Sequence, residues 1–432
     1  MIYITEGLLC AIPDTHSWAS TSRRDKSGVP FTGGNGIVVL TIDGSRVTPV
    51  DRAREILPEL RAHAAEVDDS AAFPVASLAA LRGSGLLGLL VPHAYGGLGG
   101  DLGDLAAVAE VLASACLSTA MVWAMHSQQV DALVRYAAEP LRERVLPRIA
   151  AGEVYLASVT TEPATGGNVM TAASALEQSD HVLRLDRGAP IVTGGEHADG
   201  FLITMRDSAG ASSNRVTLVY VDRNQLKLDS SGVWDPLGMR GTHSIGIRIQ
   251  GDIPIGQIVG DRGEFRSIAV DSMIPAAHIG WAACWLGAAK SGYADVILLM
   301  RSKNRPKGLD PNSELVNERL ARVRIDLELV NAYLRRVIEE VQAARAAARS
   351  LDLPSTQIHL NTLKVAASEL TFRAVDRLIQ LVGLSTGYLR TSPIPLERHF
   401  RDLRSAALNL ANDRLLTSVG TMALMDKAVT LA

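Results

Sequence analysis

The residues that could support catalysis are two adjacent threonines followed by a carboxylate, a histidine in an apolar segment, and an acidic residue near the C-terminus. Thr160 and Thr161 end a β-like run and directly precede Glu162. Hydroxyl groups can hydrogen-bond a polar ligand, and a carboxylate can act as a general base. His126 is alone in an apolar stretch, where a histidine is more often a satisfied core residue, and Asp413 could belong to a local ion pair.

The cysteines and the charge balance exclude several other classes of protein. Cys10, Cys116 and Cys284 lie far apart without metal-ligand spacing, which predicts no metal site and a reducing compartment, the cytoplasm. The chain has 43 Lys and Arg against 46 Asp and Glu, so it lacks the basic excess that a nucleic-acid partner requires. No stretch of about 18 apolar residues is free of charges, so we also expect no membrane span.

The elements that must position these residues fall into segments of different texture. The 432 residues have material for several packed units. Residues 1–47 are turn-rich and are expected to form a loosely ordered extension. Apolar spacings of three and four predict an N-terminal helical domain over 48–152, and short β-like runs predict a β-domain over 153–267. Helical periodicity then returns, most clearly over 311–350, and predicts a C-terminal helical bundle over 268–432.

Four motifs along this chain resemble those of one family. They are Val91-Pro92 through Gly97, Thr161-Glu162-Pro163, Trp234 followed by Leu237 to Thr242, and PLERHFRD at 395–402. Their order over residues 50–430 resembles the acyl-CoA dehydrogenase superfamily of flavoproteins. This resemblance implies a mainly α fold with a β-domain: an N-terminal helical domain, a middle β-barrel-like domain and a C-terminal four-helix bundle. It also implies a flavin-dependent oxidoreductase that forms a homodimer or homotetramer.

The resemblance further implies a flavin between the β-domain and the bundle. The residues that it assigns to cofactor binding are Thr160, Thr161, Thr193, Arg301, Gln380, Gly383 and Gly387. The threonines would contact the flavin ring, with the Thr193 hydroxyl at N5, and the other residues would contact the phosphates. The expected cofactor is FAD, and FMN is an alternative because the glycine loop is one residue longer than is usual in the family.

The sequence departs from the family at the catalytic base. Dehydrogenases of the family remove the α-proton of an acyl thioester with a carboxylate, and counting from Arg401-Asp402 places Leu410 at that position. Leucine cannot accept a proton. Glu162 is assigned a supporting role by the resemblance, so Asp413 and His278 are the candidates for a displaced base. Gly167 and Asn168 also replace residues that border CoA in the family, which argues against a CoA substrate.

Three functions are compatible with this departure. The first is dehydrogenation of an acyl-CoA or a carrier-protein-bound acyl thioester by a displaced base, with an electron-transfer flavoprotein as a partner. The second is monooxygenation of a small organic substrate at carbon or nitrogen, with reduced flavin supplied by a separate reductase. His126, Asn409 and Thr193 could supply hydrogen bonds for it. The candidate catalytic residues of the two enzymatic functions are therefore His126 and Asn409 for oxygenation and Asp413 as the displaced base for dehydrogenation. The third is non-catalytic binding of flavin or a partner. The sequence favours the second.

Overall fold

The N-terminal part of the structure is helical, and two of its helices begin at capping boxes. In the computed structural model, residues 47–163, 168–303, 305–306 and 309–432 are described. The expected extension therefore lies outside the described residues except for Val47, as do Cys10 and Gly167. The helical elements of this part are α1 (Pro49–Ser70), α2 (Val75–Gly83), η1 (Leu86–Gly88), η2 (His93–Tyr95), α3 (Leu102–Ala113), α4 (Leu117–Tyr136) and α5 (Glu139–Ala150). Helix α1 starts at a reciprocal capping box between Thr48 and Asp51, with Pro49 in its first turn.

The middle part consists of two four-stranded sheets. One has the strand order β1 (Leu156–Val159), β4 (Gly200–Arg206), β5 (Val216–Asp222) and β8 (Ile258–Val259). The other has the order β2 (Glu177–Ser179), β3 (Val182–Thr193), β7 (Ser244–Pro254) and β6 (Leu226–Ser231). Short 3-10 turns connect them: η4 (Gly195–His197), η5 (Arg223–Gln225), η6 (Arg240–Thr242) and η7 (Ile255–Gln257). In the described residues the two sheets do not close into one barrel.

The C-terminal part is helical again. Its elements are α6 (Phe265–Ile268), η8 (Ala269–Met273), α7 (Ile274–Arg301), α8 (Glu314–Ala346), α9 (Pro354–Val382), η9 (Leu384–Tyr388), α10 (Leu396–Arg404) and α11 (Asn412–Ala423). The apolar positions that recur along α8, such as Val323, Val330 and Val341, are buried, as their spacing predicts. None of the helices described here combines the length and apolar character that a membrane crossing requires.

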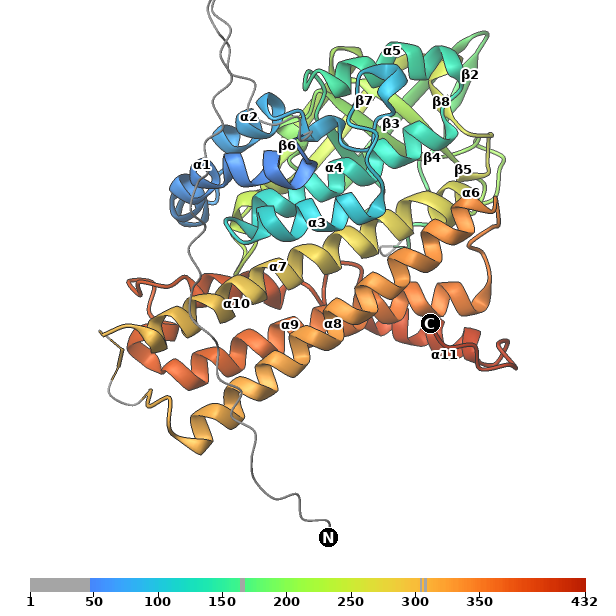
Figure 1. Cartoon of the computed structure of the whole chain (residues 1–432). Helices are drawn as coiled ribbons and strands as arrows, with labels where there is room; N and C mark the ends of the chain where they lie inside the picture. Colours follow the sequence, from blue (N-terminus) through green and yellow to red (C-terminus); the bar gives the residue numbers. More distant parts are fainter. Residues whose placement is uncertain (1–46, 164–167, 304, 307–308) are drawn as a thin grey trace, which may run out of the picture. The chain divides into compact units, whose positions relative to one another are not determined.

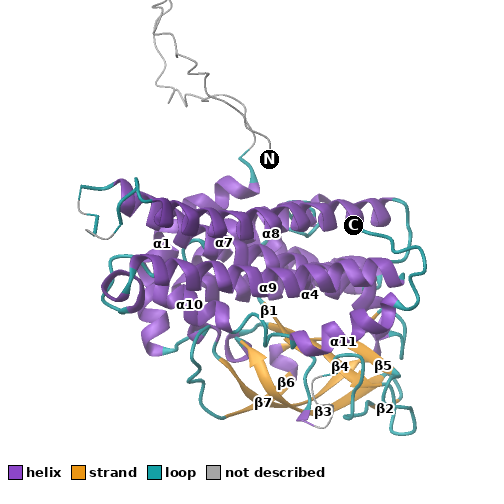
Figure 2. Ribbon diagram, turned by 90° about the horizontal axis from the view of Figure 1, so that it is seen from below, coloured by secondary structure: helices purple, strands orange, loops and turns teal. Residues whose placement is uncertain are grey.

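Helix α7 is the central element of the packing. It runs between α3 and α4 on one side and α8 and α9 on the other (Figure 1). Its residues Pro275–Ala289 are all buried, which its Ala-rich and Gly-containing sequence allows because small side chains permit close helix packing. Seen from below, the two sheets lie along one side of the helices (Figure 2). The mainly α fold with a β-domain that we expected is confirmed.

Candidate functional site

The expected threonines lie at neighbouring strand ends. Thr160 and Thr161 follow the last residue of β1, and Thr193 is the last residue of β3; all three are half-buried. The Thr161 Oγ1 donates to the carbonyl of Ile191 at 3.1 Å, which ties the end of β1 to β3. The structure therefore brings these three hydroxyl-bearing residues to one region of the β-domain.

Glu162 serves to hold a neighbouring loop. Its two carboxylate oxygens accept hydrogen bonds from the backbone N–H groups of Ala173 and Ser174, at 2.6 and 2.9 Å. Burial by itself would raise the pKa of Glu162, but hydrogen bonds from Ser174 and Ala173 and the charge of Arg187 outweigh it and lower the pKa. A buried carboxylate held in its ionised form by backbone donors is a weak base, which fits the supporting role expected for it.

The Thr193 hydroxyl belongs to a series of hydroxyl groups. Its Oγ1 lies 3.0 Å from Oγ of Ser244, its cross-strand partner on β7. The Ser244 hydroxyl donates to Oγ1 of Thr242 at 2.9 Å, and the Thr242 hydroxyl donates to the carbonyl of Met239 at 2.9 Å. Gly194 follows at φ +59°, and a Cβ there would lie 2.5 Å from the Phe73 ring and 2.6 Å from the Tyr155 hydroxyl. Only glycine allows this tight turn directly after Thr193.

A second group of polar side chains surrounds Leu410. This residue lies in the turn between α10 and α11 at φ +53°, and its carbonyl accepts a hydrogen bond from Lys364 Nζ at 2.9 Å. Lys364 is completely buried on α9, also donates to Asn412 Oδ1 at 2.7 Å, and lies over the ring of Trp285. Burial lowers the pKa of Lys364 to about 8. The family's base position thus carries an apolar side chain whose backbone is held by a buried lysine.

The two candidate bases, Asp413 and His278, lie in contrasting environments. Asp413 is exposed in the first turn of α11, whereas Asn409 is half-buried and has no acid–base chemistry. His278 is buried on α7 with Nδ1 3.1 Å from the carbonyl of Leu360, and burial lowers its pKa to about 3. A histidine with so low a pKa stays neutral and is a poor proton acceptor at neutral pH.

His126 has backbone partners on both ring nitrogens. Its Nε2 lies 3.0 Å from the carbonyl of Leu87, and its Nδ1 lies 3.0 Å from the backbone N of Leu156, which can only donate. Nδ1 is therefore the acceptor and Nε2 carries the proton. Burial lowers the pKa of His126 to about 4, which keeps the ring neutral. His126 joins α4 to η1 and β1, and neither nitrogen remains for a substrate.

The groups expected to bind the phosphates lie at the ends of two C-terminal helices. Arg301 ends α7 and is exposed, and together with Arg305 and Met300 it lines a hollow of about 380 Å³. Gln380 is exposed near the end of α9, where its amide donates to Asp376 at 2.7 Å. Gly383 ends α9 at φ +79°, and Gly387 is buried within η9 against Val382. The residues expected at the phosphates therefore lie on or next to α7, α9 and η9, whereas the threonines lie at the ends of β1 and β3.

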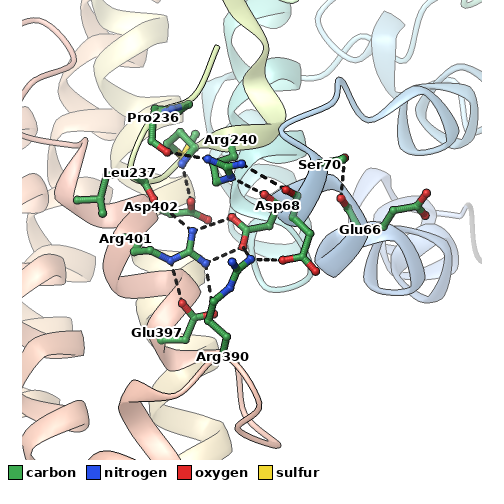
Figure 3. A network of polar contacts seen from close by, with 12 residues as sticks. Glu66, Asp68, Ser70, Pro236, Leu237, Arg240, Arg390, Glu397, Arg401 and Asp402 are labelled. Atoms are coloured by element: carbon green, nitrogen blue, oxygen red, sulfur yellow. Dashed lines mark hydrogen bonds and ion pairs between the residues drawn. The ribbon is translucent and has the colours of Figure 1, made fainter. Parts of the chain in front are cut away.

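A charged network joins the three parts of the fold (Figure 3). Arg401 on α10 forms a bidentate pair with Asp68 of α1, at 2.9 and 2.6 Å, and also contacts Glu397. The adjacent Asp402 accepts a hydrogen bond from the backbone N of Met239 at 2.6 Å. Burial raises the pKa of Asp402 to about 7, although the Met239 hydrogen bond opposes the shift. The network therefore fixes the turn that carries the Met239 carbonyl.

Several of these residues were not anticipated from the sequence. Thr242 ends η6 and Ser244 begins β7, and only the pairing of β7 with β3 brings them to Thr193. Lys364 had a usable signal, because it lies four residues after Leu360 and three before Ala367 on the buried face of α9. The Nε1 atoms of Trp281 and Trp285 on α7 are buried without a partner in the described residues. Such unpartnered donors suit a ligand rich in acceptors, as a flavin ring is.

Comparisons with known proteins agree with the fold described above. The family model for the acyl-CoA dehydrogenase N-terminal domain matches residues 50–153, and the model for the C-terminal domain matches residues 279–414. Isobutyryl-CoA dehydrogenase of Dictyostelium discoideum is 25% identical over 326 residues, which are 74% of this chain and 74% of that protein.

Solved structures share the fold at lower identity. Butyryl-CoA dehydrogenase from Megasphaera elsdenii matches with a TM-score of 0.77 at 19% identity and covers 87% of this chain and 97% of its own. FMN-bound TdsC from Paenibacillus sp. A11-2 matches with a TM-score of 0.76 at 20% identity and covers 88% and 98%. The matches span the helical and the β-rich parts together. The chain belongs to the acyl-CoA dehydrogenase superfamily of flavin-dependent oxidoreductases.

Proposed function

We propose that this protein is a monooxygenase that uses reduced flavin to hydroxylate a small organic substrate at carbon or nitrogen. The observation that carries the proposal is the apolar side chain of Leu410 at the position of the family's base, in a turn whose backbone is held by Lys364. Removal of an α-proton needs a base within reach, whereas insertion of oxygen needs a dry pocket and hydrogen-bonding groups. Leu410 cannot meet the first requirement, and its apolar side chain is compatible with the dry pocket that the second requires.

The remaining titratable groups support the same choice. His278 is neutral with a pKa near 3, and the two ring nitrogens of His126 are occupied by backbone groups. Asp413 is exposed to solvent in the first turn of α11, so water is not excluded from its carboxylate. Asn409, next to Leu410, keeps an amide that can orient a substrate without taking a proton.

The flavin would be held by residues of the β-domain and the bundle. Thr160, Thr161 and Thr193 would bind the ring edge, and Arg301, Gln380, Gly383 and Gly387 would bind the phosphates of FAD, with Arg301 acting across a homodimer or homotetramer. FMN, which TdsC binds, is the alternative cofactor. Bound in its reduced state, flavin supplies two electrons that allow one atom of O₂ to enter the substrate while the other leaves as water. A separate reductase that uses NAD(P)H would restore the reduced state.

A second candidate is dehydrogenation of an acyl thioester, with an electron-transfer flavoprotein as the partner. The similarity to isobutyryl-CoA dehydrogenase favours it. Asp413 would then be the displaced base, since it lies three residues after Leu410 in the first turn of α11. The exposure of Asp413 counts against this role, because a base for a C–H acid works best where water is excluded.

The two candidates predict opposite behaviour toward thioesters. The purified protein, saturated with oxidised FAD, is mixed anaerobically with isobutyryl-CoA and with butyryl-CoA, and the flavin absorbance is followed. We expect no bleaching with the wild type. A Leu410→Glu variant, which restores a carboxylate at that position, is the matched test of whether the pocket admits a thioester. Bleaching of the wild-type flavin by either thioester would overturn the monooxygenase proposal.

A further inference from the structure

The hydroxyl groups from Thr193 to Met239 form three consecutive oxygen–oxygen contacts. These are Thr193 Oγ1 to Ser244 Oγ at 3.0 Å, Ser244 Oγ to Thr242 Oγ1 at 2.9 Å, and Thr242 Oγ1 to the Met239 carbonyl at 2.9 Å. Ser244 and Thr242 are buried, with 5% and 4% of their surface exposed, so water does not compete with these contacts. Two oxygens at this distance attract each other only when one hydrogen lies between them.

The number of hydrogens fixes the direction of this chain. A hydroxyl has one hydrogen to donate, and a carbonyl has none. Three contacts therefore require all three hydroxyl hydrogens, one in each contact. Thr242 must donate to the Met239 carbonyl, Ser244 must donate to Thr242, and Thr193 must donate to Ser244.

The carbonyl end of the chain is firmly held. The Met239 carbonyl also accepts hydrogen bonds from the backbone N of Thr242 at 3.1 Å and from Trp234 Nε1 at 3.3 Å. The backbone N of Met239 donates to the buried Asp402 at 2.6 Å. With both of its backbone groups bonded, Met239 cannot turn its carbonyl away, and the direction of the chain is maintained.

The Thr193 hydroxyl therefore has no hydrogen left for a ligand and offers only its lone pairs. We infer that Thr193, through Ser244 and Thr242, makes the site selective for reduced over oxidised flavin. This inference rests on the proposed function, in which Thr193 binds the edge of the flavin ring, and on the N5 position that the family resemblance implies for its hydroxyl. Reduced flavin carries a hydrogen on N5 and can donate to Thr193, whereas N5 of oxidised flavin is an acceptor that would face another acceptor. A monooxygenase that takes up reduced flavin from a separate reductase gains from this preference.

Two variants test the direction of the chain. Ser244→Ala removes the acceptor of the Thr193 hydrogen, which then becomes free to point toward the ligand and donate to N5 of oxidised flavin. Thr242→Val acts one step further from the ligand: Ser244 loses its acceptor and can donate to Thr193 instead. Ser244→Thr keeps a hydroxyl at the middle position and is the matched control.

The measured quantity is the dissociation constant for oxidised FAD divided by that for reduced FAD. Both constants come from anaerobic titrations of each protein. We expect the wild type and Ser244→Thr to bind reduced FAD more tightly. Ser244→Ala and Thr242→Val should each lower the ratio by about tenfold, the value of one hydrogen bond of about 1.4 kcal/mol. Far-UV circular dichroism confirms that each variant is folded.

The outcomes separate this inference from the proposed function. If the wild type binds FAD but the ratio does not fall in a folded Ser244→Ala or Thr242→Val protein, the inference is wrong and the monooxygenase proposal stands. If a thioester bleaches the flavin while the ratio changes as expected, the proposed function is wrong and the hydrogen-bond direction stands. If the wild type binds neither redox state of FAD or of FMN, both are wrong.

Discussion

Replacing Lys364 with methionine should change how the stability of the protein depends on pH. The Lys364 ammonium is completely buried, and burial lowers its pKa from 10.5 to about 8. Between these two values the folded protein carries a neutral lysine while the unfolded chain still carries a charged one. Unfolding therefore takes up a proton, and the free energy of unfolding rises with pH in this window.

The size of the effect follows from the shift. Each pKa unit corresponds to about 1.36 kcal/mol, so the shift is worth about 3 kcal/mol in full and about 2 kcal/mol between pH 7 and about pH 9.5. A measurement at pH 7 alone would be a poor test, because two opposing effects determine whether Lys364→Met is more or less stable than the wild type. Methionine removes the cost of burying a charge, but it also leaves the Leu410 carbonyl and Asn412 Oδ1 without their donor.

Urea unfolding of the wild type and Lys364→Met at several pH values measures this difference. Subtracting the two curves removes the contributions of groups that both proteins share, such as the buried thiols of Cys116 and Cys284, whose pKa values burial raises. We expect the wild type to gain about 2 kcal/mol relative to the variant from pH 7 to about pH 9.5. If the difference in the free energy of unfolding between the two proteins stays constant across this range, burial does not lower the pKa of Lys364. That result would refute the assignment of Lys364 as a buried lysine that binds the Leu410 carbonyl.

Three further changes have clear expectations. Asp413→Asn should leave the rate of substrate oxidation unchanged, because this exposed carboxylate is not the base; a large loss of rate in steady-state assays would contradict the proposed function. Gly238→Ala should lower the free energy of unfolding in urea by about 1–3 kcal/mol, because its Cβ would overlap the backbone of Arg401. The raised pKa of Asp402, about 7, means that the folded state keeps a proton that the unfolded chain releases above about pH 4, so stability falls as pH rises. Between pH 5 and pH 7 the wild type should lose about 2 kcal/mol relative to Asp402→Asn, as measured by thermal or urea unfolding.

The sequence predicts the fold class well because it depends on local patterns. The recurring apolar residues of α8 are buried as their spacing indicates, and Trp281 and Trp285 are buried as their one-turn spacing on α7 indicates. The leucine at position 410, where counting from Arg401-Asp402 places the family's base, can also be read from the sequence, since the count stays close to one motif.

The roles of single polar residues were harder to predict. His126 was a catalytic candidate, but its partners are backbone atoms of Leu87 and Leu156, and backbone atoms leave no signature in a sequence. Lys364 lies 46 residues before Leu410, so its hydrogen bond to the Leu410 carbonyl depends on the packing of α9 against the turn before α11. These interactions arise from tertiary structure, which no local pattern encodes.

The direction of the hydroxyl chain shows the same limit at the candidate site. A series of hydroxyls that ends on a carbonyl presents an acceptor at its other end, whereas one that ends on an N–H presents a donor. The sequence contains Thr193, Thr242 and Ser244 in either case. What decides is the turn at Met239, a residue at φ +56° whose backbone N is held by Asp402. The charged network that joins the three parts of the fold therefore also determines which redox state of a flavin the Thr193 hydroxyl can accept.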